Sequence, residues 1–482
     1  MLHALLLLIP AVLPVCAHTN EAQLEKALDS VQPHHLRADL RFLSSEDMRG
    51  RETPSPELQV AALFLRSRVQ RLGFTPGASN GWFYDYPVFS PRLDLNESYV
   101  DLQAAESAQR LIFGEDYYFR MSKQSFPLEQ SGGVICVGEG SEEEIEDLDL
   151  TGAWALVLDR GRSARRPIER CMIAGAIGVI ATPGPRYDRD TYQKKFAKRT
   201  ESVRNRASAS IIVPEQGTKP PVVMLSRASG ARLFEQANAT WEGAYPPAGL
   251  DLDLTVHEKR EVDLGSTEVS NVCAFWPGSD PELAKEVMIV SAHYDHVGVM
   301  KGAIHPGADD NASGTSGLLA VAEALKAYGP MKRSVLLIWV SGEEKGLWGS
   351  KVWTLDPWLP EGCKPVLDIN IDMIGRTESD ELYITPSREH EAFNSLAGLA
   401  YELAPSEGFA ELQGQDEYWR RSDHMNFNDN LEIPVVFLSS GDHPDYHKPT
   451  DTYEKIDYEK LTRTVRLVVR LLDSAQGAEL TR

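Results

Sequence analysis

Residues 291–317 read SAHYDHVGVMKGAIHPGADDNASGTSG, and this stretch decides the fold. The apolar run at residues 287–290 leads into it and is typical of a buried strand, which gives way to His293, Tyr294 and Asp295. Fourteen residues later, the small-residue segment 309–314 opens a predicted helix. A histidine and an aspartate just past a strand, with further carboxylates at a helix start, are a plausible beginning of a metal site.

The sequence around this stretch alternates between strand-like and helical patterns from residue 256 onward. Helical stripes of Leu, Val and Ala cover residues 318–325 and 461–472, and another helix is predicted between the N-cap Ser55 and Gly73. The buried strands are expected at residues 287–290, 335–340, 366–371 and 435–438. This alternation predicts an α/β fold with a mainly parallel sheet sandwiched by helices.

The middle of the chain, residues 100–255, has a different character. Short apolar runs separated by glycine, proline and charge predict a small, mostly β unit with one or two helices. The predicted strands are residues 133–137, 153–158, 178–181, 210–213 and 222–225. An acidic cluster at residues 142–149 and basic clusters at 160–170 and 194–206 are typical of a solvated surface, although the arginines could instead meet a charged end of a substrate.

A family resemblance can be stated for this middle unit. The sequence DLTGAWALV at residues 149–157, followed by RG at 160–161 and AGAIGVI at 174–180, resembles a protease-associated (PA) domain. Such domains are commonly inserted into secreted peptidases as lids or substrate-contacting modules. The resemblance implies a PA insertion at residues 100–255 and a core domain made of residues 18–99 and 256–482.

Composition excludes several classes of protein. The chain has 482 residues, 42% of them hydrophobic, and a formal net charge of −22. It is long enough for two domains, and its acidity argues against nucleic acid or an anionic membrane as the main partner. Cys136, Cys171, Cys273 and Cys363 are too few for a disulfide framework, so buried thiols with at most one or two bridges are expected.

The N-terminal residues resemble a signal peptide. A short apolar run at residues 5–13 precedes Val15, Cys16 and Ala17, an A-x-A-like cleavage pattern. The run is too short to span a bilayer. We therefore expect a signal peptide at residues 1–17 and an exported protein, whether secreted, periplasmic or extracellular. The alternatives are a buried N-terminal helix and a lipid anchor at Cys16.

Four of the predicted strands end at polar clusters. They lead to His293 and Asp295, to residues 341–344, to Asp372, and to the loop at residues 443–447. In an open α/β sheet, ligands bind beyond the carboxyl ends of the strands, so these segments can converge. Imidazoles and carboxylates without thiolates suit zinc, and five such ligands suit two metals with one bridging carboxylate.

These clusters resemble the di-zinc aminopeptidase and glutamate carboxypeptidase family, whose zinc-exopeptidase fold is phosphorylase/hydrolase-like. The motifs that carry the resemblance are HYD at 293–295, GADDNASG at 307–314, GEE at 342–344, IDMIG at 371–375, SDH at 422–424 and YHKPTDT at 446–452. The resemblance implies two Zn²⁺ per chain, with Asp310 bridging them. The implied metal ligands are His293, Asp310, Glu344, Asp372 and His447.

Other residues receive roles around these ligands. Glu343 is expected to be the general base, Tyr446 to hold the oxyanion, and Asp295 to orient His293. Asp309 and Asn311 are expected to cap the start of a helix. Three residues rank below the ligand set: Asp423 and His424 as supporting residues, and His443 as a less favoured ligand than His447.

The predicted function is that of an exported metallo-exopeptidase, most simply an aminopeptidase, which hydrolyses terminal peptide bonds of a peptide substrate with a water activated by two zincs. A carboxypeptidase or dipeptidase on the same core is an alternative, with Arg376, Arg420 and Arg421 or arginines of the middle unit holding a carboxylate. A glutaminyl cyclase with one metal and a non-catalytic, receptor-like binding protein are further alternatives. The sequence leaves the oligomeric state open.

Overall fold

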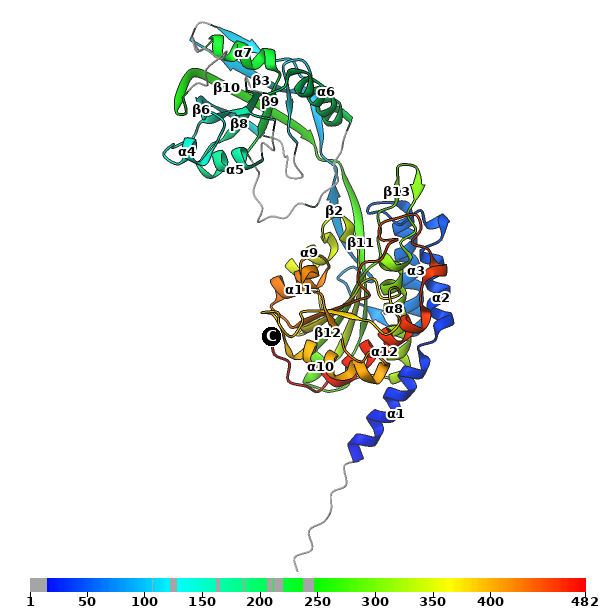
Figure 1. Cartoon of the computed structure of the whole chain (residues 1–482). Helices are drawn as coiled ribbons and strands as arrows, with labels where there is room; N and C mark the ends of the chain where they lie inside the picture. The colour runs from blue at the N-terminus through cyan, green and yellow to red at the C-terminus, as the bar shows by residue number, and fades with distance from the viewer. Residues whose placement is uncertain are drawn as a thin grey trace, which may run out of the picture. The chain divides into compact units, whose positions relative to one another are not determined.

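The computed structural model describes residues 15–482 apart from 106, 122–127, 162–164, 185–186, 206–210, 212–219 and 237–246 (Figure 1). The chain divides into two compact units, unit 1 (residues 1–86 and 268–482) and unit 2 (residues 87–267). Sequence patterns placed the boundaries at 100 and 255 instead. The difference arises because the long strands β3 (Arg92–Gln103) and β10 (Leu250–Asp263) pair with each other in the sheet of unit 2.

Unit 1 is built on a nine-stranded sheet whose centre is parallel. The central strands, in spatial order, are β15 (Ser334–Val340), β12 (Glu286–His293), β16 (Lys364–Ile371) and β19 (Val435–Ser439). Antiparallel strands β11 (Ser266–Trp276) and β17 (Tyr383–Thr385) flank this centre. The outer strands are β1 (Thr75–Pro76), β2 (Phe83–Phe89) and β18 (Gln413–Gly414). The four predicted strands are thus the four central ones.

Both faces of this sheet are buried, as expected for parallel strands covered by helices. Along β12, Met288 and Val290 belong to one apolar core, and Val287 and Ile289 belong to the other. Helices that contribute to the first core are α1 (Val15–Ser30), α2 (Pro33–Leu43), α3 (Pro56–Leu72), α8 (Gly314–Tyr328), α10 (Ser395–Leu403) and α12 (Tyr458–Ala475). Helices α9 (Trp348–Leu355) and α11 (His424–Leu431) contribute to the second. The predicted α/β sandwich is confirmed.

Helix α3 shows how local sequence sets an element. The side chain of Ser55 accepts a hydrogen bond from the Leu58 amide (3.1 Å), and Gly73 ends the helix with φ of 93°. Both predicted end signals are confirmed. The remaining elements of unit 1 are short: η1 (Glu46–Met48), η2 (Leu283–Lys285), β13 (Val299–Met300), β14 (Ala303–Ile304), η3 (Ala308–Ser313), η4 (Glu343–Lys345), η5 (Ala404–Glu407), η6 (Asp416–Tyr418) and η7 (Tyr453–Lys455).

Unit 2 has an eight-stranded sheet with an apolar core on each face. Its other strands are β4 (Ala108–Arg110), β5 (Tyr117–Phe119), β6 (Leu128–Cys136), β7 (Trp154–Asp159), β8 (Gly178–Pro183) and β9 (Val222–Leu225). The described residues form four helices rather than the predicted one or two: α4 (Glu142–Ile145), α5 (Arg165–Ile173), α6 (Arg189–Asn205) and α7 (Arg227–Gln236). The sequences of α5 and α6 are rich in charged residues, so the pattern predicts a solvated surface there and not two helices. The predicted strand at 210–213 lies outside the described residues except for Ile211.

Three further expectations concern cysteines and the N-terminus. Cys136, Cys171, Cys273 and Cys363 are free, and the first three of them are buried. Most of the predicted signal peptide, residues 1–14, lies outside the described residues, and α1 begins at Val15. The helices of the described part of the chain include none with the length and apolar character needed to cross a bilayer.

Candidate active site

The predicted ligands come together at the carboxyl end of the central strands. His293 is the last residue of β12, Asp372 follows β16 directly, and Glu344 lies in the short turn η4 after β15. Asp310 lies in η3, the irregular turn that leads into α8, and His447 lies in the loop after β19. Segments up to about 150 residues apart in sequence therefore meet at one edge of the sheet, as the topology of an open α/β fold requires.

A first group contains His293, Asp310 and Asp372, all of them buried. The Nε2 atom of His293 lies 3.1 Å from Oδ1 of Asp372 and 3.5 Å from Oδ1 of Asp310. The second oxygen of Asp372 accepts a hydrogen bond from the Ser422 hydroxyl (2.9 Å), which fixes the orientation of this carboxylate. These atoms lie close enough together to bind one metal ion.

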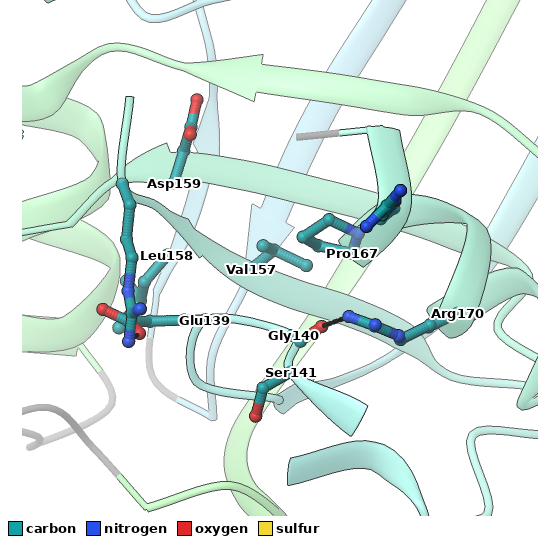
Figure 2. Close-up of a pocket in the computed structure, with 10 residues that line it drawn as sticks. Glu139, Gly140, Ser141, Val157, Leu158, Asp159, Pro167 and Arg170 are labelled. Carbon is teal, nitrogen blue, oxygen red and sulfur yellow. Dashed lines mark hydrogen bonds and ion pairs between the residues drawn. The ribbon is translucent and has the colours of Figure 1, made fainter. Parts of the chain in front are cut away.

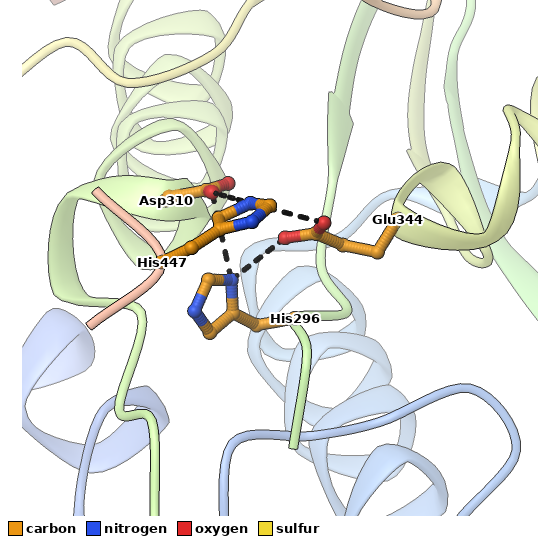
Figure 3. Close-up of side chains that lie close together, drawn as sticks. All are labelled: His296, Asp310, Glu344 and His447. Carbon is orange, nitrogen blue, oxygen red and sulfur yellow. Dashed lines mark hydrogen bonds and ion pairs between the residues drawn. The ribbon is translucent and has the colours of Figure 1, made fainter. Parts of the chain in front are cut away.

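A second group contains His296, Asp310, Glu344 and His447 (Figure 3). The Nε2 atom of His447 lies 3.0 Å from Oδ2 of Asp310 and 3.2 Å from Oε2 of Glu344. Asp310 is common to both groups and turns a different oxygen to each. His296 was not predicted, although it stands three residues after His293 in the stretch that decides the fold.

The chemistry of these donors fits divalent metal ions. Asp310, Glu344 and Asp372 crowd three carboxylates into a mostly buried space, where uncompensated negative charge is costly. Burial raises the pKa of Asp310, and the nearby Glu344 carboxylate adds to the rise. The Nε2 atom of His447 has no hydrogen-bond partner of good geometry. Imidazoles and carboxylates with one shared carboxylate are the donor set expected for a pair of zinc ions.

The two histidines of the second group respond differently to their surroundings. Burial lowers the pKa of His296 to about 3, against the attraction of Asp310. Burial would also lower the pKa of His447, but the neighbouring carboxylates of Asp310 and Glu344 raise it to about 10. An imidazole must be neutral to bind a metal, so a metal ion would displace a proton from His447.

Glu343 lies beside these groups without belonging to either. Burial raises the pKa of its carboxyl well above the ordinary value; His293 opposes the rise, and Glu344 and Asp372 add to it. Its backbone amide donates a hydrogen bond to Oδ1 of Asp295 (3.2 Å). A carboxylate with a raised pKa is suited to accept a proton during catalysis.

Asp295 connects the end of β12 to η4. It is fully buried, and its Oδ2 atom accepts a hydrogen bond from the Thr53 hydroxyl (3.0 Å). The Nδ1 atom of His293 lies 3.2 Å from the backbone oxygen of Asp295 and 3.7 Å from its carboxylate. Asp295 thus contacts both His293 and the backbone of Glu343, as a residue that orients the site would do.

Tyr446 packs on a predicted ligand. Its ring stacks on that of His447, with centroids 3.9 Å apart and an angle of 25° between the planes. Burial raises the pKa of the phenol far above its usual value, and the carboxylates of Asp310 and Glu344 contribute. The phenol therefore keeps its proton and remains a hydrogen-bond donor.

The family comparison agrees with this geometry. The model described as "Peptidase family M28" matches residues 271–472, which include β12, β15, β16, β19 and both ligand groups. This part of the chain is similar to peptidase family M28.

Two curated relatives and one solved structure are also similar to the chain. Aminopeptidase YwaD of Bacillus subtilis (strain 168) is 29% identical over 272 residues, which are 54% of this chain and 52% of that protein. A probable leucine aminopeptidase of Arthroderma otae is 28% identical over 199 residues, 39% of this chain and 54% of that protein. The chain thus spans about half the length of the curated relatives it matches. The aminopeptidase from Aneurinibacillus sp. strain AM-1 shares the fold, with a TM-score of 0.52, 19% identity, and coverage of 94% of this chain and 96% of that one.

Beside the two groups of candidate ligands, Arg51 is a supporting residue that the sequence did not reveal. It is buried and donates hydrogen bonds to four backbone oxygens: Leu43, Tyr294, Pro306 and Gly307. Tyr294 lies between His293 and Asp295, and Gly307 lies three residues before Asp310. A single guanidinium therefore holds the segment that follows His293 and the segment that precedes Asp310. No sequence signal marked it, because its partners are backbone atoms.

Asp451 supports the segment that carries Asp310. Its carboxylate accepts hydrogen bonds from the amides of Asp309 (3.0 Å) and Asp310 (3.2 Å). The predicted cap role of Asp309 is wrong, because its carboxylate accepts from the Gly375 amide (2.7 Å) instead. The cap role of Asn311 is confirmed by a hydrogen bond from the Gly314 amide (2.8 Å).

The residues ranked lower lie near the two groups of candidate ligands without joining them. His443 lies 3.4 Å from Asp309, away from both ligand groups. Asp423 is buried, and burial raises its pKa to about 7 against the attraction of His293. His424 stacks on Phe437, with ring centroids 4.9 Å apart, and so packs in the core.

Among the arginines considered for a substrate carboxylate, three have partners already: Arg376, Arg160 and Arg170. Arg376 forms an ion pair with Asp445 (2.8 Å) and lies 3.8 Å from Asp451. In unit 2, a cavity of about 310 Å³ is lined by arginines and by Glu139 (Figure 2). There Arg160 pairs with Glu139, and Arg170 donates a hydrogen bond to the Gly140 oxygen (3.1 Å).

Proposed function

We propose that this chain is an exported, zinc-dependent aminopeptidase that removes residues from the N-terminus of peptides. The observation that carries the proposal is the position of Asp310, whose two oxygens face two separate groups of metal donors. The activity of the curated relatives named as aminopeptidases supports the choice of reaction. The apolar run at residues 5–13, followed by Ala17, supports export.

The ligand set proposed is His293, Asp310, Glu344, Asp372 and His447. Two zinc ions held by these residues would polarise the scissile carbonyl and lower the pKa of a water molecule. Glu343 accepts the proton of that water and passes it to the departing amine. Its partly buried position beside both groups and its raised pKa support this role.

Asp295 and Tyr446 complete the arrangement. Asp295 holds the imidazole of His293 and the backbone of Glu343 in place through the contacts described above. Tyr446, stacked on His447, donates a hydrogen bond from its hydroxyl to the oxygen that becomes negatively charged as water attacks the carbonyl. Each residue thus acts where charge develops during hydrolysis.

Cleavage at the N-terminal rather than the C-terminal end is favoured by the state of Arg376. A carboxypeptidase needs a cation that is available to a substrate carboxylate. Arg376 is instead paired with Asp445, and Asp451 lies on its other side. We also infer that residues 100–255 are a PA insertion, since the motifs at 149–157 and 174–180 cover β7 and the start of β8, adjacent strands of unit 2.

A peptide panel tests this function. Purified protein is incubated with free peptides, N-acetylated peptides and C-amidated peptides, and the products are identified by mass spectrometry. Free and C-amidated peptides should lose N-terminal residues, and N-acetylated peptides should stay intact. A chelator should abolish cleavage, and zinc should restore it. Release of C-terminal residues from N-acetylated peptides would instead establish a carboxypeptidase.

A further inference from the structure

His296 has a position that the roles assigned so far leave unexplained. It is fully buried, and its Nδ1 atom lies 2.8 Å from Oε1 of Glu344 and 3.6 Å from Oδ2 of Asp310. Its ring also meets that of His447 edge-on, with centroids 5.5 Å apart. In Figure 3 the ring nitrogens of both histidines and the two carboxylates converge on one another. His296 thus faces the same small space as the three proposed ligands of the second group.

The spacing of these four donors fits a tetrahedral zinc ion. Zinc binds nitrogen and oxygen at about 2.0–2.2 Å, so neighbouring ligand atoms in a tetrahedron lie about 3.3–3.6 Å apart. The nitrogen–oxygen separations within the group lie around this value: 2.8 and 3.6 Å for His296, and 3.0 and 3.2 Å for His447. All four donor atoms lie within 4.8 Å of one another.

The other group has fewer donors. Among the residues that the structure describes, only His293, Asp310 and Asp372 form it. Zinc sites closed by four protein ligands hold the ion firmly, whereas sites with three protein ligands keep a position open for water or substrate. The two groups in this chain therefore differ in the number of side chains that can bind a metal ion, four against three, and His296 makes the difference.

We propose that His296 is a fourth protein ligand in the second group, so that one zinc is held by four side chains and the other, at His293, by three. This inference rests on the proposed function only for the identity of the metal. The four-ligand zinc is the tightly held ion, and the three-ligand zinc is the exchangeable one that keeps a position open to the substrate.

Zinc retention tests the proposal without measuring activity. The full chain is dialysed against a series of zinc buffers, and bound zinc is counted by elemental analysis. As the free zinc concentration is lowered, the wild-type protein should lose one zinc first. It should lose the second only after the free zinc concentration has fallen by a further factor of at least about 100. Loss of even a supporting partner costs about 10–100-fold in metal affinity, so removal of a direct ligand should cost at least about 100-fold.

Variants assign the two steps. His296→Ala should weaken the tight step by at least about 100-fold, whereas His293→Ala should remove the weak step and leave the tight one. His35→Ala, which removes a partly exposed histidine paired with Glu323, should retain both steps and serves as the control. Retention of both wild-type affinities by His296→Ala would overturn the proposal, as would simultaneous loss of both zincs from the wild type.

A second measurement on the wild-type protein does not depend on a variant folding. X-ray absorption at the zinc edge counts imidazoles around the bound metal. With two zincs bound, the proposal expects three imidazoles shared between them, and two would overturn it. The result is separable from the proposed function: a protein with these zinc steps but no cleavage in the peptide panel would refute the aminopeptidase and leave His296 as a ligand.

Discussion

Oδ1 of Asp310 lies 3.5 Å from His293, and Oδ2 of the same carboxylate lies 3.0 Å from His447. The two histidines are more than 150 residues apart in the sequence, one at the end of β12 and the other in the loop after β19, and this one carboxylate joins their groups. The site therefore works as a unit only if Asp310 keeps both oxygens as acceptors.

Asp310→Asn should disable both groups at once. An amide offers one weak oxygen donor in place of two anionic ones, so we expect bound zinc to fall below one per chain. The ratio kcat/KM should fall about 10³-fold or more, because metal ions supply several kcal/mol of transition-state stabilisation. Elemental analysis and kinetics on a leucine anilide check this, with the exposed Asp380→Asn as the control. A variant with two tightly bound zincs would contradict a bridging role.

Glu343→Gln should separate catalysis from metal binding. The amide keeps the size of the side chain but cannot accept a proton, and general-base catalysis contributes about 10²–10⁴-fold. We expect kcat to fall by that factor while two zincs remain bound, as measured by turnover and elemental analysis on the same sample. Glu344→Gln should instead reduce zinc content. Turnover within about threefold of the wild type for Glu343→Gln would refute the assignment of the base.

Arg51→Lys should destabilise unit 1. The guanidinium donates to four backbone oxygens, including those of Leu43 and Pro306, and an ammonium has only three donors without the planar fork. Buried acceptors left without a partner cost about 1–3 kcal/mol each, so we expect the free energy of unfolding to fall by about 3 kcal/mol. Denaturant unfolding measures it. Arg71→Lys, on the exposed side of α3, should change it by less than about 0.5 kcal/mol.

Glu258 should make the stability of unit 2 depend on pH. Burial raises the pKa of this fully buried carboxyl to about 7 from 4.5, and Arg260 only partly opposes the rise. The folded state then binds the proton more tightly than the unfolded state. Its stabilisation is fully present below pH 4.5 and is lost as the pH rises through 7, by up to about 3 kcal/mol. Hydrogen exchange of unit 2 amides in urea at pH 5 and pH 8 measures the change.

The variant Glu258→Gln carries a permanent neutral side chain at this position, so its stability should change little between pH 5 and pH 8. Glu261→Gln, on the same strand but partly exposed, should keep the wild-type dependence. An equally steep pH dependence in Glu258→Gln would show that another group is responsible.

Sequence patterns predicted the parts of the site that depend on local order. The apolar runs that became β12, β15, β16 and β19 are buried on both faces, and such runs are continuous in sequence. His293 ends β12, Asp372 follows β16 directly, and Glu344 lies in the turn after β15. Arg51 could not be predicted in this way, because its partners are carbonyl oxygens that only the folded chain brings together. The sequence did not predict a metal-binding role for His296, because the family resemblance implied five ligands and His296 is not one of them.

In unit 2, the polarity of α5 and α6 hid their helical character. Such helices have a narrow apolar stripe, since they pack on the sheet with few residues such as Ile168 and Phe196. Charge then dominates the pattern along the sequence. Tertiary packing, rather than local propensity, makes these segments helical.

The chain leaves unit 1 along β2 and returns along β11, and these two strands are hydrogen-bonded neighbours in one sheet. Everything between them is therefore inserted at the open end of what would otherwise be an ordinary hairpin. A tight turn could join the strands without disturbing their register. Pairing of β2 with β11 therefore keeps both parts of unit 1 in one sheet, although unit 2 separates them in the sequence.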